Sequence, residues 1–258
     1  MRFCSLGSGS EGNALLIECG AGSTAVRLLI DCGFGMRELQ RRLQRVGLEP
    51  RDLSAMLITH EHGDHVDGAP RLAAKFGIPL HMTCGTALAT GLGRADGAMP
   101  SLIDPHRPFE VGGVRIEPVP VPHDAREPVQ FVIDAGGRRL GVLTDLGRST
   151  PHVLRAMSRL DALVLECNHD EGLLRDGNYP AMLKRRIAGD YGHLANAAAA
   201  HILGAIDQDR LRTVVAAHLS RSNNSPELAR AALSAAWGCA PEDIVVADQD
   251  DGFGWIAV

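Results

Sequence analysis

The segment THEHGDH, residues 59–65, contains four potential metal ligands within six positions: His60, His62, Asp64 and His65. The apolar run at 53–58 predicts a buried strand before the segment, and apolar residues at helical spacing predict a helix over 66–76. The ligands therefore lie in a loop between a strand and a helix, where side chains can converge on one point. The alternative is a histidine-rich surface loop. Because three of the chain's 11 histidines fall in this one segment, we predict a metal site.

The ligand types and their spacing favour two ions over one. Imidazole and carboxylate groups suit divalent ions such as zinc, manganese or iron(II). His60 and His62 are two positions apart and can face the same way in an extended turn, whereas Asp64 and His65 project elsewhere. We therefore expect two divalent metal ions per chain.

Composition and charge limit the class of protein. With 258 residues, 45% of them hydrophobic, the chain can bury a full core, and because it contains no linker or repeat we expect one domain over 1–258. The net charge of −5 gives no overall electrostatic case for nucleic acid, although a local basic strip is compatible with it.

The chain lacks the apolar core of a signal peptide and any run near the ~18 apolar residues of a membrane span. Its six cysteines are scattered without CxxC pairs, as is typical of reduced thiols. We expect a cytoplasmic protein with no membrane partner.

Several elements can be expected from local patterns. Short apolar runs separated by glycine turns in the first third predict antiparallel strands joined by hairpins. Residues 93–113 are rich in Gly, Pro and Asp and are expected to form a loop. Helices are expected at about 180–188 and at 195–206. Ser225 and Pro226 have the residue types of an N-cap and a first helical position, which predicts a further helix there.

Histidine or acidic residues stand where predicted strands end, and this happens six times: at Asp31, at the cluster beginning with His60, and at His123, Asp145, Glu166 and His218. A strand-end histidine taken singly is often a structural or surface residue. In a sandwich of two sheets, however, the loops at one edge converge. The recurrence therefore predicts one shared site.

This set of residues resembles the metallo-β-lactamase superfamily, whose fold is an αββα four-layer sandwich. The resemblance covers essentially the whole chain. It implies that His60, His62 and His123 hold one metal, that Asp64, His65 and His218 hold the second, and that Asp145 bridges both. Asp31, in the segment LLIDCG, matches an early Asp of the family that supports the ligand loop.

Finer features resemble nuclease branches of that superfamily more than β-lactamases. Asp145 stands where the commonest β-lactamases have Cys. Glu166 and His193 (in GHLAN) resemble motifs of ribonuclease Z and its relatives, in which the Glu orients a His that assists leaving-group departure. The resemblance thus implies a catalytic set of His193, Glu166 and Asp64; the alternative for His193 is a structural role near a helix start.

Two further segments, SLGSGSEGN at 5–13 and HLSRSNNSP at 218–226, look most like the YycJ/WalJ group, compact bacterial proteins associated with DNA exonuclease activity. Ala195 is a departure, since that group has Ser there. Arg221, Asn223 and Asn224 are candidate contacts to phosphate oxygens, with a polar, helix-capping turn as the alternative. Asn178 and Tyr179 are weaker candidates.

The resemblance implies a metal-dependent phosphodiesterase in which a bridging hydroxide attacks phosphorus. Its expected partner is nucleic acid, with DNA exonuclease activity favoured over RNA processing. One alternative is a small-molecule hydrolase of the same fold, acting on a cyclic phosphodiester, a thioester or a lactone. An acyl hydrolase, however, has less need of Glu166 with His193. Another alternative is a non-catalytic or oxygen-handling iron protein. Oxygen-reducing diiron members generally have Glu and Asp where His62 and His65 stand here.

Overall fold

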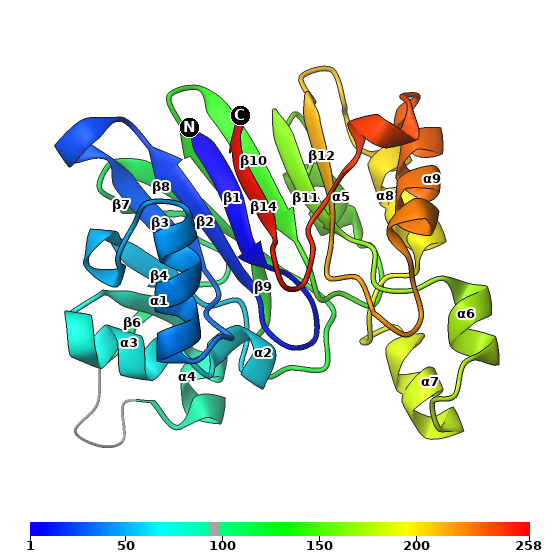
Figure 1. The fold of residues 1–258 in the computed structure, drawn as a ribbon, viewed down its shortest axis with the longest axis horizontal. Helices are drawn as coiled ribbons and strands as arrows, with labels where there is room; N and C mark the ends of the chain where they lie inside the picture. Colours follow the sequence, from blue (N-terminus) through cyan, green and yellow to red (C-terminus); the bar gives the residue numbers. More distant parts are fainter. Residues whose placement is uncertain (93–98) are drawn as a thin grey trace.

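Two seven-stranded β-sheets lie face to face in the computed structural model, which describes residues 1–92 and 99–258 (Figure 1). In spatial order, the first sheet consists of β14 (Phe253–Ala257), β1 (Arg2–Gly7), β2 (Ala14–Cys19), β3 (Val26–Ile30), β4 (Ala55–Leu57), β5 (Leu80–Thr83) and β6 (Ser101–Ile103). The second consists of β13 (Val245–Val246), β12 (Thr213–Ala217), β11 (Ala162–Glu166), β10 (Arg138–Leu143), β9 (Val129–Ala135), β8 (Val114–Pro120) and β7 (Phe109–Val111). Both sheets mix parallel and antiparallel pairs.

Helices cover the outer face of each sheet, which gives the expected four-layer αββα order. The first sheet packs against α1 (Met36–Arg45), α3 (Ala69–Phe76) and α4 (Cys84–Thr90). The second packs against α5 (Pro151–Ala156), α8 (Asn196–Ala205) and α9 (Pro226–Trp237). Three further helices are α2 (Gly63–Val66), α6 (Glu171–Asp176) and α7 (Ala181–Ile187).

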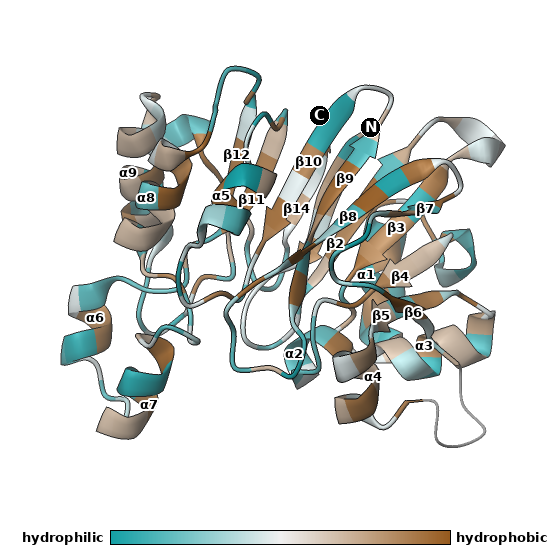
Figure 2. Ribbon diagram, turned by 180° about the vertical axis from the view of Figure 1, so that it is seen from behind, coloured by the Kyte–Doolittle hydropathy of each residue, from teal (hydrophilic) through white to brown (hydrophobic). Residues whose placement is uncertain are grey.

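Alternating side chains along the strands build three apolar layers. In β3, Leu28 and Ile30 face the layer between the sheets, whereas Leu29 faces the helices. In β11, Val164 faces the layer between the sheets, and Leu163 faces the opposite way toward α8 and α9. This period of two is the geometry of a strand buried on both faces. Figure 2 shows apolar residues concentrated on the central strands.

The strand directions bring distant loops to one edge. β3 runs parallel to β4, and β10, β11 and β12 run parallel to one another. β8 points the same way as β10, because each pairs antiparallel with β9. The segments that follow these strands carry Asp31, His60, His123, Asp145 and His218, and Glu166 is the last residue of β11.

Most of the expected elements are confirmed, and two expectations are wrong in detail. The antiparallel pairing of β1, β2 and β3 is confirmed, as is the N-cap of α9, where the Ser225 side chain accepts a hydrogen bond from Leu228 N. The helix expected over 66–76 is in fact two helices, α2 and α3, which meet near Gly68. Short strands β6 and β7 lie within 93–113, which was expected to be a loop; residues 93–98 of that segment lie outside the described residues. Among the helices of the described ranges, none has the length and apolar character needed to cross a bilayer.

Candidate metal centre

Three residues of the site have a left-handed backbone. Asp31, Asp145 and His218 have φ values of 60°, 51° and 56°, and they follow β3, β10 and β12. This conformation costs a residue other than glycine about 1–2 kcal/mol. Only one other described residue apart from the glycines, Arg159, has a positive φ. The strain is therefore concentrated at the turns that direct strand-end side chains toward the site.

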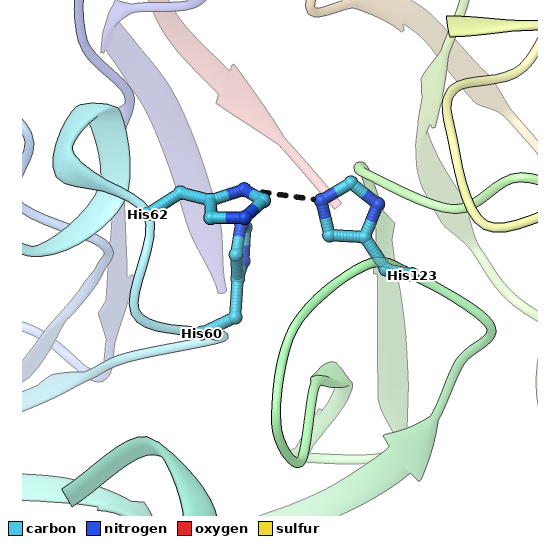
Figure 3. A group of neighbouring side chains, drawn as sticks. All are labelled: His60, His62 and His123. Atoms are coloured by element: carbon cyan, nitrogen blue, oxygen red, sulfur yellow. Dashed lines mark hydrogen bonds between the residues drawn. The ribbon is translucent and has the colours of Figure 1, made fainter. Parts of the chain in front are cut away.

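His60, His62 and His123 offer three nitrogen atoms that lie within 4.8 Å of one another. Figure 3 shows the His60 and His62 rings, from the loop after β4, facing His123, from the loop after β8, with His62 Nδ1 3.2 Å from His123 Nε2. The Nδ1–H of His123 donates to the carbonyl oxygen of Gly192 at 3.0 Å, which leaves Nε2 with a free lone pair. Outer hydrogen bonds of this kind fix the orientation of metal-binding imidazoles.

His60 has an unused acceptor inside the protein. The Thr59 hydroxyl lies 2.9 Å from Asp31 Oδ2, to which it donates its proton, and it therefore accepts from His60 Nδ1 at 2.9 Å. His60 Nε2 is then the unprotonated nitrogen with a free lone pair, and this atom is buried without a hydrogen-bond partner. Burial lowers the pKa of His60 well below its usual value, so the ring is neutral. A buried lone pair without a donor fits a metal ion.

Asp64, His65 and His218 form a second group of the same size. Asp64 Oδ2 lies 3.3 Å from His65 Nε2 and 3.4 Å from His218 Nε2. His65 Nδ1 donates to Asp31 Oδ2 at 2.8 Å, so that its Nε2 faces Asp64. Asp31 thus supports both groups, through His65 directly and through Thr59 to His60.

Asp145 lies between the two groups. Its Oδ2 is 3.1 Å from His65 Nε2, and Asp145 also forms a potential ligand group with His60 and His65 within the same 4.8 Å limit. On its other side, Oδ1 is 3.6 Å from His218 Nδ1. Asp145 Oδ2 is buried and makes no hydrogen bond of acceptable geometry. The carboxylate is placed where one oxygen could face each of two ions.

The buried carboxylates of this site need nearby positive charge to compensate them. Burial alone would lower the pKa of His65 and His218, but Asp145 and its neighbouring carboxylates raise the pKa of His65 well above its usual value and that of His218 to about 10. Burial would raise the pKa of Asp145, yet His218 and His65 hold it well below its usual value. Protons on two histidines thus compensate the carboxylates, and divalent ions can take the place of those protons. The donor set of imidazole and carboxylate suits zinc, manganese or iron(II).

Glu166 and His193 form an ion pair beside this centre. Glu166 Oε1 lies 2.7 Å from His193 Nδ1, and Oε2 accepts the backbone N–H groups of Leu146 and Leu194 at 3.0 and 3.2 Å. Burial would raise the pKa of Glu166, but His193 holds it at about 2; in turn Glu166 raises the pKa of His193, although burial opposes this. The Glu166 side chain is fully buried, whereas that of His193 is 17% exposed. The carboxylate is therefore fixed, and the imidazole can be reached from outside.

The pair also touches the candidate ligands, since His193 Nδ1 is 3.4 Å from Asp145 Oδ1. Asp145, Glu166, His193 and His218 together lie close enough to surround a cation. Because this position would also allow His193 to bind a cation, the general-acid role expected for it stays a prediction.

A cavity of about 360 Å³ opens over the centre. Besides Asp64, Asp145, His193 and His218, it is lined by side chains near α7 that the sequence did not indicate or indicated only weakly: Tyr179, Leu183, Arg186 and Ile187. Arg186 makes an ion pair with Asp124 at 2.6 Å. The only sequence signal was the basic run KRR at 184–186, which five residues separate from the GHLAN segment.

Two asparagines and a threonine of the site were also missed. Asn13 Nδ2 lies 3.3 Å from Asp64 Oδ2 and 3.1 Å from His65 Nε2. Asn168 donates to the backbone oxygen of His218 at 3.1 Å, and Thr59 connects Asp31 to His60. Asn13 belongs to the SLGSGSEGN segment, so its position in that motif was the one available signal.

The three residues expected to contact substrate follow His218 in the chain. Their polar groups already make hydrogen bonds or ion pairs within the protein. Arg221 makes ion pairs with Glu11 at 3.2 Å and with Asp250. Asn224 donates to the Cys167 carbonyl oxygen at 2.7 Å. Asn223 is buried, and its amide nitrogen lies 3.2 Å from Ser220 Oγ. Their role toward substrate stays a prediction.

Comparison with known proteins agrees with this geometry. Residues 26–218 match the family described as "Beta-lactamase superfamily domain". The chain is 34% identical to the exodeoxyribonuclease YycJ of Bacillus anthracis over 240 residues, which is 91% of this chain and 88% of that protein. It is 32% identical to the exodeoxyribonuclease WalJ of Streptococcus pneumoniae, over 88% of this chain and 85% of that one.

Solved structures share the fold at low sequence identity. The metallo-β-lactamase fold protein YhfI from Bacillus subtilis superposes with a TM-score of 0.74 at 16% identity, covering 99% of each chain. Zn²⁺-bound PqqB from Methylobacterium extorquens gives a TM-score of 0.70 at 20% identity over the full length of both chains. Human tRNase Z, short form, gives 0.67 at 16% identity, covering 100% of this chain and 99% of that one.

Proposed function

Because this chain belongs to the metallo-β-lactamase superfamily, as a hydrolase with buried His and Asp clusters, we propose that it is a dinuclear phosphodiesterase that degrades DNA as an exonuclease. The observation that carries the proposal is the Glu166–His193 pair, 2.7 Å between Oε1 and Nδ1, beside Asp145. Two relatives called exodeoxyribonucleases, at 34% and 32% identity, favour DNA as the substrate.

In this proposal His60, His62 and His123 would hold one ion, Asp64, His65 and His218 would hold the other, and Asp145 would be a ligand shared by both. Two divalent ions held there would supply Lewis acidity toward phosphate oxygens and a nucleophile at neutral pH. Asn13 and Asp31 orient the ligands: the Asp31 carboxylate accepts from His65 and Thr59, and the Asn13 amide is within hydrogen-bond distance of Asp64.

His193 supplies the proton that the departing sugar oxygen needs. An alkoxide is a poor leaving group, so the P–O bond breaks more easily when the oxygen is protonated as it leaves. His193 donates its Nδ1–H to Glu166, and its second ring nitrogen, Nε2, carries the proton that passes to the departing oxygen. Glu166 is ionised because His193 holds its pKa low, and Leu146 N and Leu194 N fix the carboxylate by donating to its Oε2. When hydroxide, formed from a water that has lost a proton to solvent, adds to phosphorus, the old ester bond breaks. The departing oxygen takes the His193 proton and leaves as an alcohol, and the imidazolium becomes neutral.

Cationic side chains near the centre would guide the strand despite the net charge of −5. Arg186 lines the cavity over the centre. Arg221, Asn223 and Asn224 remain our proposed contacts to phosphate oxygens. Ser220, which precedes Arg221, lines the same cavity, and a phosphate group there would compete with Glu11 and Asp250 for the guanidinium.

The test uses metal-stripped protein reloaded separately with manganese, zinc and iron(II). Each form is given a 5′-phosphorylated, end-labelled DNA duplex, the matched RNA, bis-p-nitrophenyl phosphate and a thioester. We expect stepwise shortening of DNA, abolished in His62→Ala. Cleavage of the small phosphodiester alone would replace the exonuclease by a small-molecule phosphodiesterase, and thioester hydrolysis alone would remove phosphoryl transfer.

A further inference from the structure

A second, larger cavity lies on the other side of His193. It has a volume of about 630 Å³ and is bounded by α6, α7 and the start of α8. Figure 1 shows α6 and α7 together at the end of the molecule that carries α8 and α9. His193 lines both this cavity and the one over the candidate ligands. The volume is within the range of about 300–1000 Å³ that is usual for pockets that hold small organic ligands.

The walls of this cavity are mainly apolar. Leu174, Ala188, Ala195 and Ala198 provide the apolar part. His169 also lines it, is only 2% exposed, and has a buried Nδ1 without a hydrogen-bond partner. Because this nitrogen has almost no accessible surface, a ligand in the cavity would not reach it. The cavity wall itself, which is mainly apolar, favours a flat apolar group.

Cationic side chains surround the same cavity. Among its lining residues, Arg175, Lys184 and Arg185 stand against one carboxylate, that of Glu171. Arg175 is held by Asp176 at 2.9 Å, and Lys184 donates to the backbone oxygen of Arg175 at 2.7 Å. Lys184 and Arg185 thus leave local positive charge beside an apolar surface. An anionic ligand with a flat apolar part, such as a nucleotide, fits this chemistry.

We propose that this cavity is the subsite for the nucleoside that carries the departing oxygen, with Lys184 and Arg185 facing its flanking phosphate. The proposal rests on the proposed phosphodiesterase function. In-line displacement puts the departing oxygen opposite the attacking one, so the leaving nucleoside extends away from the metal side. A group that protonates this oxygen must stand on the same side. His193 is that group, and the cavity behind it is the space that the nucleoside enters.

α7 is then the wall shared by two parts of one substrate site. Leu183 and Ile187 face the cavity over the candidate ligands, and Lys184 and Arg185 face the second cavity. None of the residues of α7 is buried. The helix therefore contributes little to the apolar core, and its amphipathic sequence is accounted for by contacts with substrate on both sides.

The test fills the second cavity without changing a candidate ligand. Ala198→Phe places a large side chain on its α8 wall, and the matched control is Ala197→Phe, at the neighbouring exposed position that does not line it. We expect Ala198→Phe to lower kcat/KM for DNA by about 5- to 100-fold, the scale of one lost base contact, and to lower that for bis-p-nitrophenyl phosphate much less. Ala197→Phe should match the wild type on both substrates. Equal loss on both substrates in Ala198→Phe would overturn the proposal.

A binding measurement separates this proposal from the catalytic one. Isothermal titration of the wild type with dAMP, deoxyadenosine and inorganic phosphate needs no turnover. We expect dAMP to bind the wild type and Ala197→Phe equally and Ala198→Phe at least about 5-fold more weakly, and Lys184→Glu/Arg185→Glu to weaken dAMP more than deoxyadenosine. Unchanged dAMP affinity in both lining variants, or phosphate binding as tightly as dAMP, would overturn the subsite. If the wild type binds dAMP but does not cleave DNA, the proposed exonuclease function is wrong and the cavity is a nucleotide-binding site only.

If Ala198→Phe does not fold, as judged by its melting temperature, the Lys184→Glu/Arg185→Glu variant decides alone, because both side chains lie at the surface of α7. In that case a selective loss of dAMP affinity over deoxyadenosine supports the subsite, and equal affinity for the two ligands rejects it.

Discussion

In our proposal, the proton on His193 is the residue-scale feature that distinguishes phosphoryl transfer from metal binding alone. His193→Ala should keep its metal ions, because His193 is outside both expected ligand sets, and should lose about 10²- to 10⁴-fold in kcat on DNA. The loss on bis-p-nitrophenyl phosphate should be much smaller, since p-nitrophenolate leaves without a proton. Both rates and the metal content by mass spectrometry are measured on the same preparation.

The control for this variant is His201→Ala, at an exposed position on α8. It should behave as the wild type on both substrates. Normal DNA turnover in His193→Ala, or an equal loss on the two substrates, would remove His193 from its role as general acid.

Asp145 is the residue on which our proposed two-ion arrangement depends. Its Oδ2 is buried without a hydrogen bond and lies 3.1 Å from His65 Nε2. Asp145→Ala should therefore reduce the metal content to one ion or fewer per chain after dialysis, because the two groups would lose their common oxygen ligand. Two tightly held ions in this variant would contradict the bridging role.

Residue-scale prediction from sequence worked where ligands are neighbours or follow a repeated rule. His60, His62, Asp64 and His65 are visible together in seven letters of sequence, and the strand-end pattern led to the others. Asn13 and Arg186 could not be found in this way. They reach the site through the packing of the first β-hairpin and of α7, and the motif around Asn13 and the basic run around Arg186 do not by themselves show that these side chains face the site.

At the scale of elements, prediction was strong for long periodic segments and weak for short ones. α5 and α6 have six residues each, too few for a helical period to be visible, although Thr150 and Asp170 cap them as helix-starting residues do. The break between α2 and α3 lies at Gly68, just before the proline in the first turn of α3. A tertiary contact requires the glycine, because a side chain there would place Cβ 2.0 Å from the Phe34 carbonyl oxygen. No local propensity encodes that contact.

Gly33 is a similar close contact, and it supports a prediction about the ligand loop. A Cβ at Gly33 would lie 1.9 Å from the backbone oxygen of Asp64, so Gly33→Ala must displace the loop that carries Asp64 and His65. We expect a loss of about 1–3 kcal/mol in the free energy of unfolding together with weaker metal retention, measured by chemical denaturation and metal analysis.

Gly204→Ala is the matched control, because nothing lies within 4 Å of a Cβ at that helical position. It should be neutral or stabilise the protein by up to about 1 kcal/mol. Equal stability and metal retention in the two variants would mean that the β3–α1 loop tolerates the shift.

At the scale of the whole molecule, we infer that residues 1–258 form one domain. The apolar layer between the sheets takes Phe3 and Leu57 from one sheet and Phe131 and Val164 from the other, so neither sheet can bury its inner face alone. The site depends on the same arrangement, since its residues follow strands of both sheets. Sequence predicted a shared site because loops at one edge of a two-sheet sandwich converge, and it predicted the four-layer architecture through the resemblance to the metallo-β-lactamase superfamily. The pairing order of the strands came only from the structure.

The same arrangement links global stability, pH and metal. The pKa of His218 is raised to about 10 and that of His65 well above its usual value, whereas both are near 6.5 in an unfolded chain. Their protonation therefore stabilises the metal-free fold fully below about pH 6.5, and this contribution is lost as the pH rises toward 10. Metal ions replace those protons and bind more tightly over the same range. At a buffered free-metal concentration, the difference in melting temperature between metal-loaded and chelated protein should widen from pH 7 to pH 9.5. In Asp145→Asn, which lacks the carboxylate that raises both pKa values, the chelated protein should lose less stability over this range. A constant or narrowing difference in the wild type would show that His65 and His218 do not exchange protons for metal.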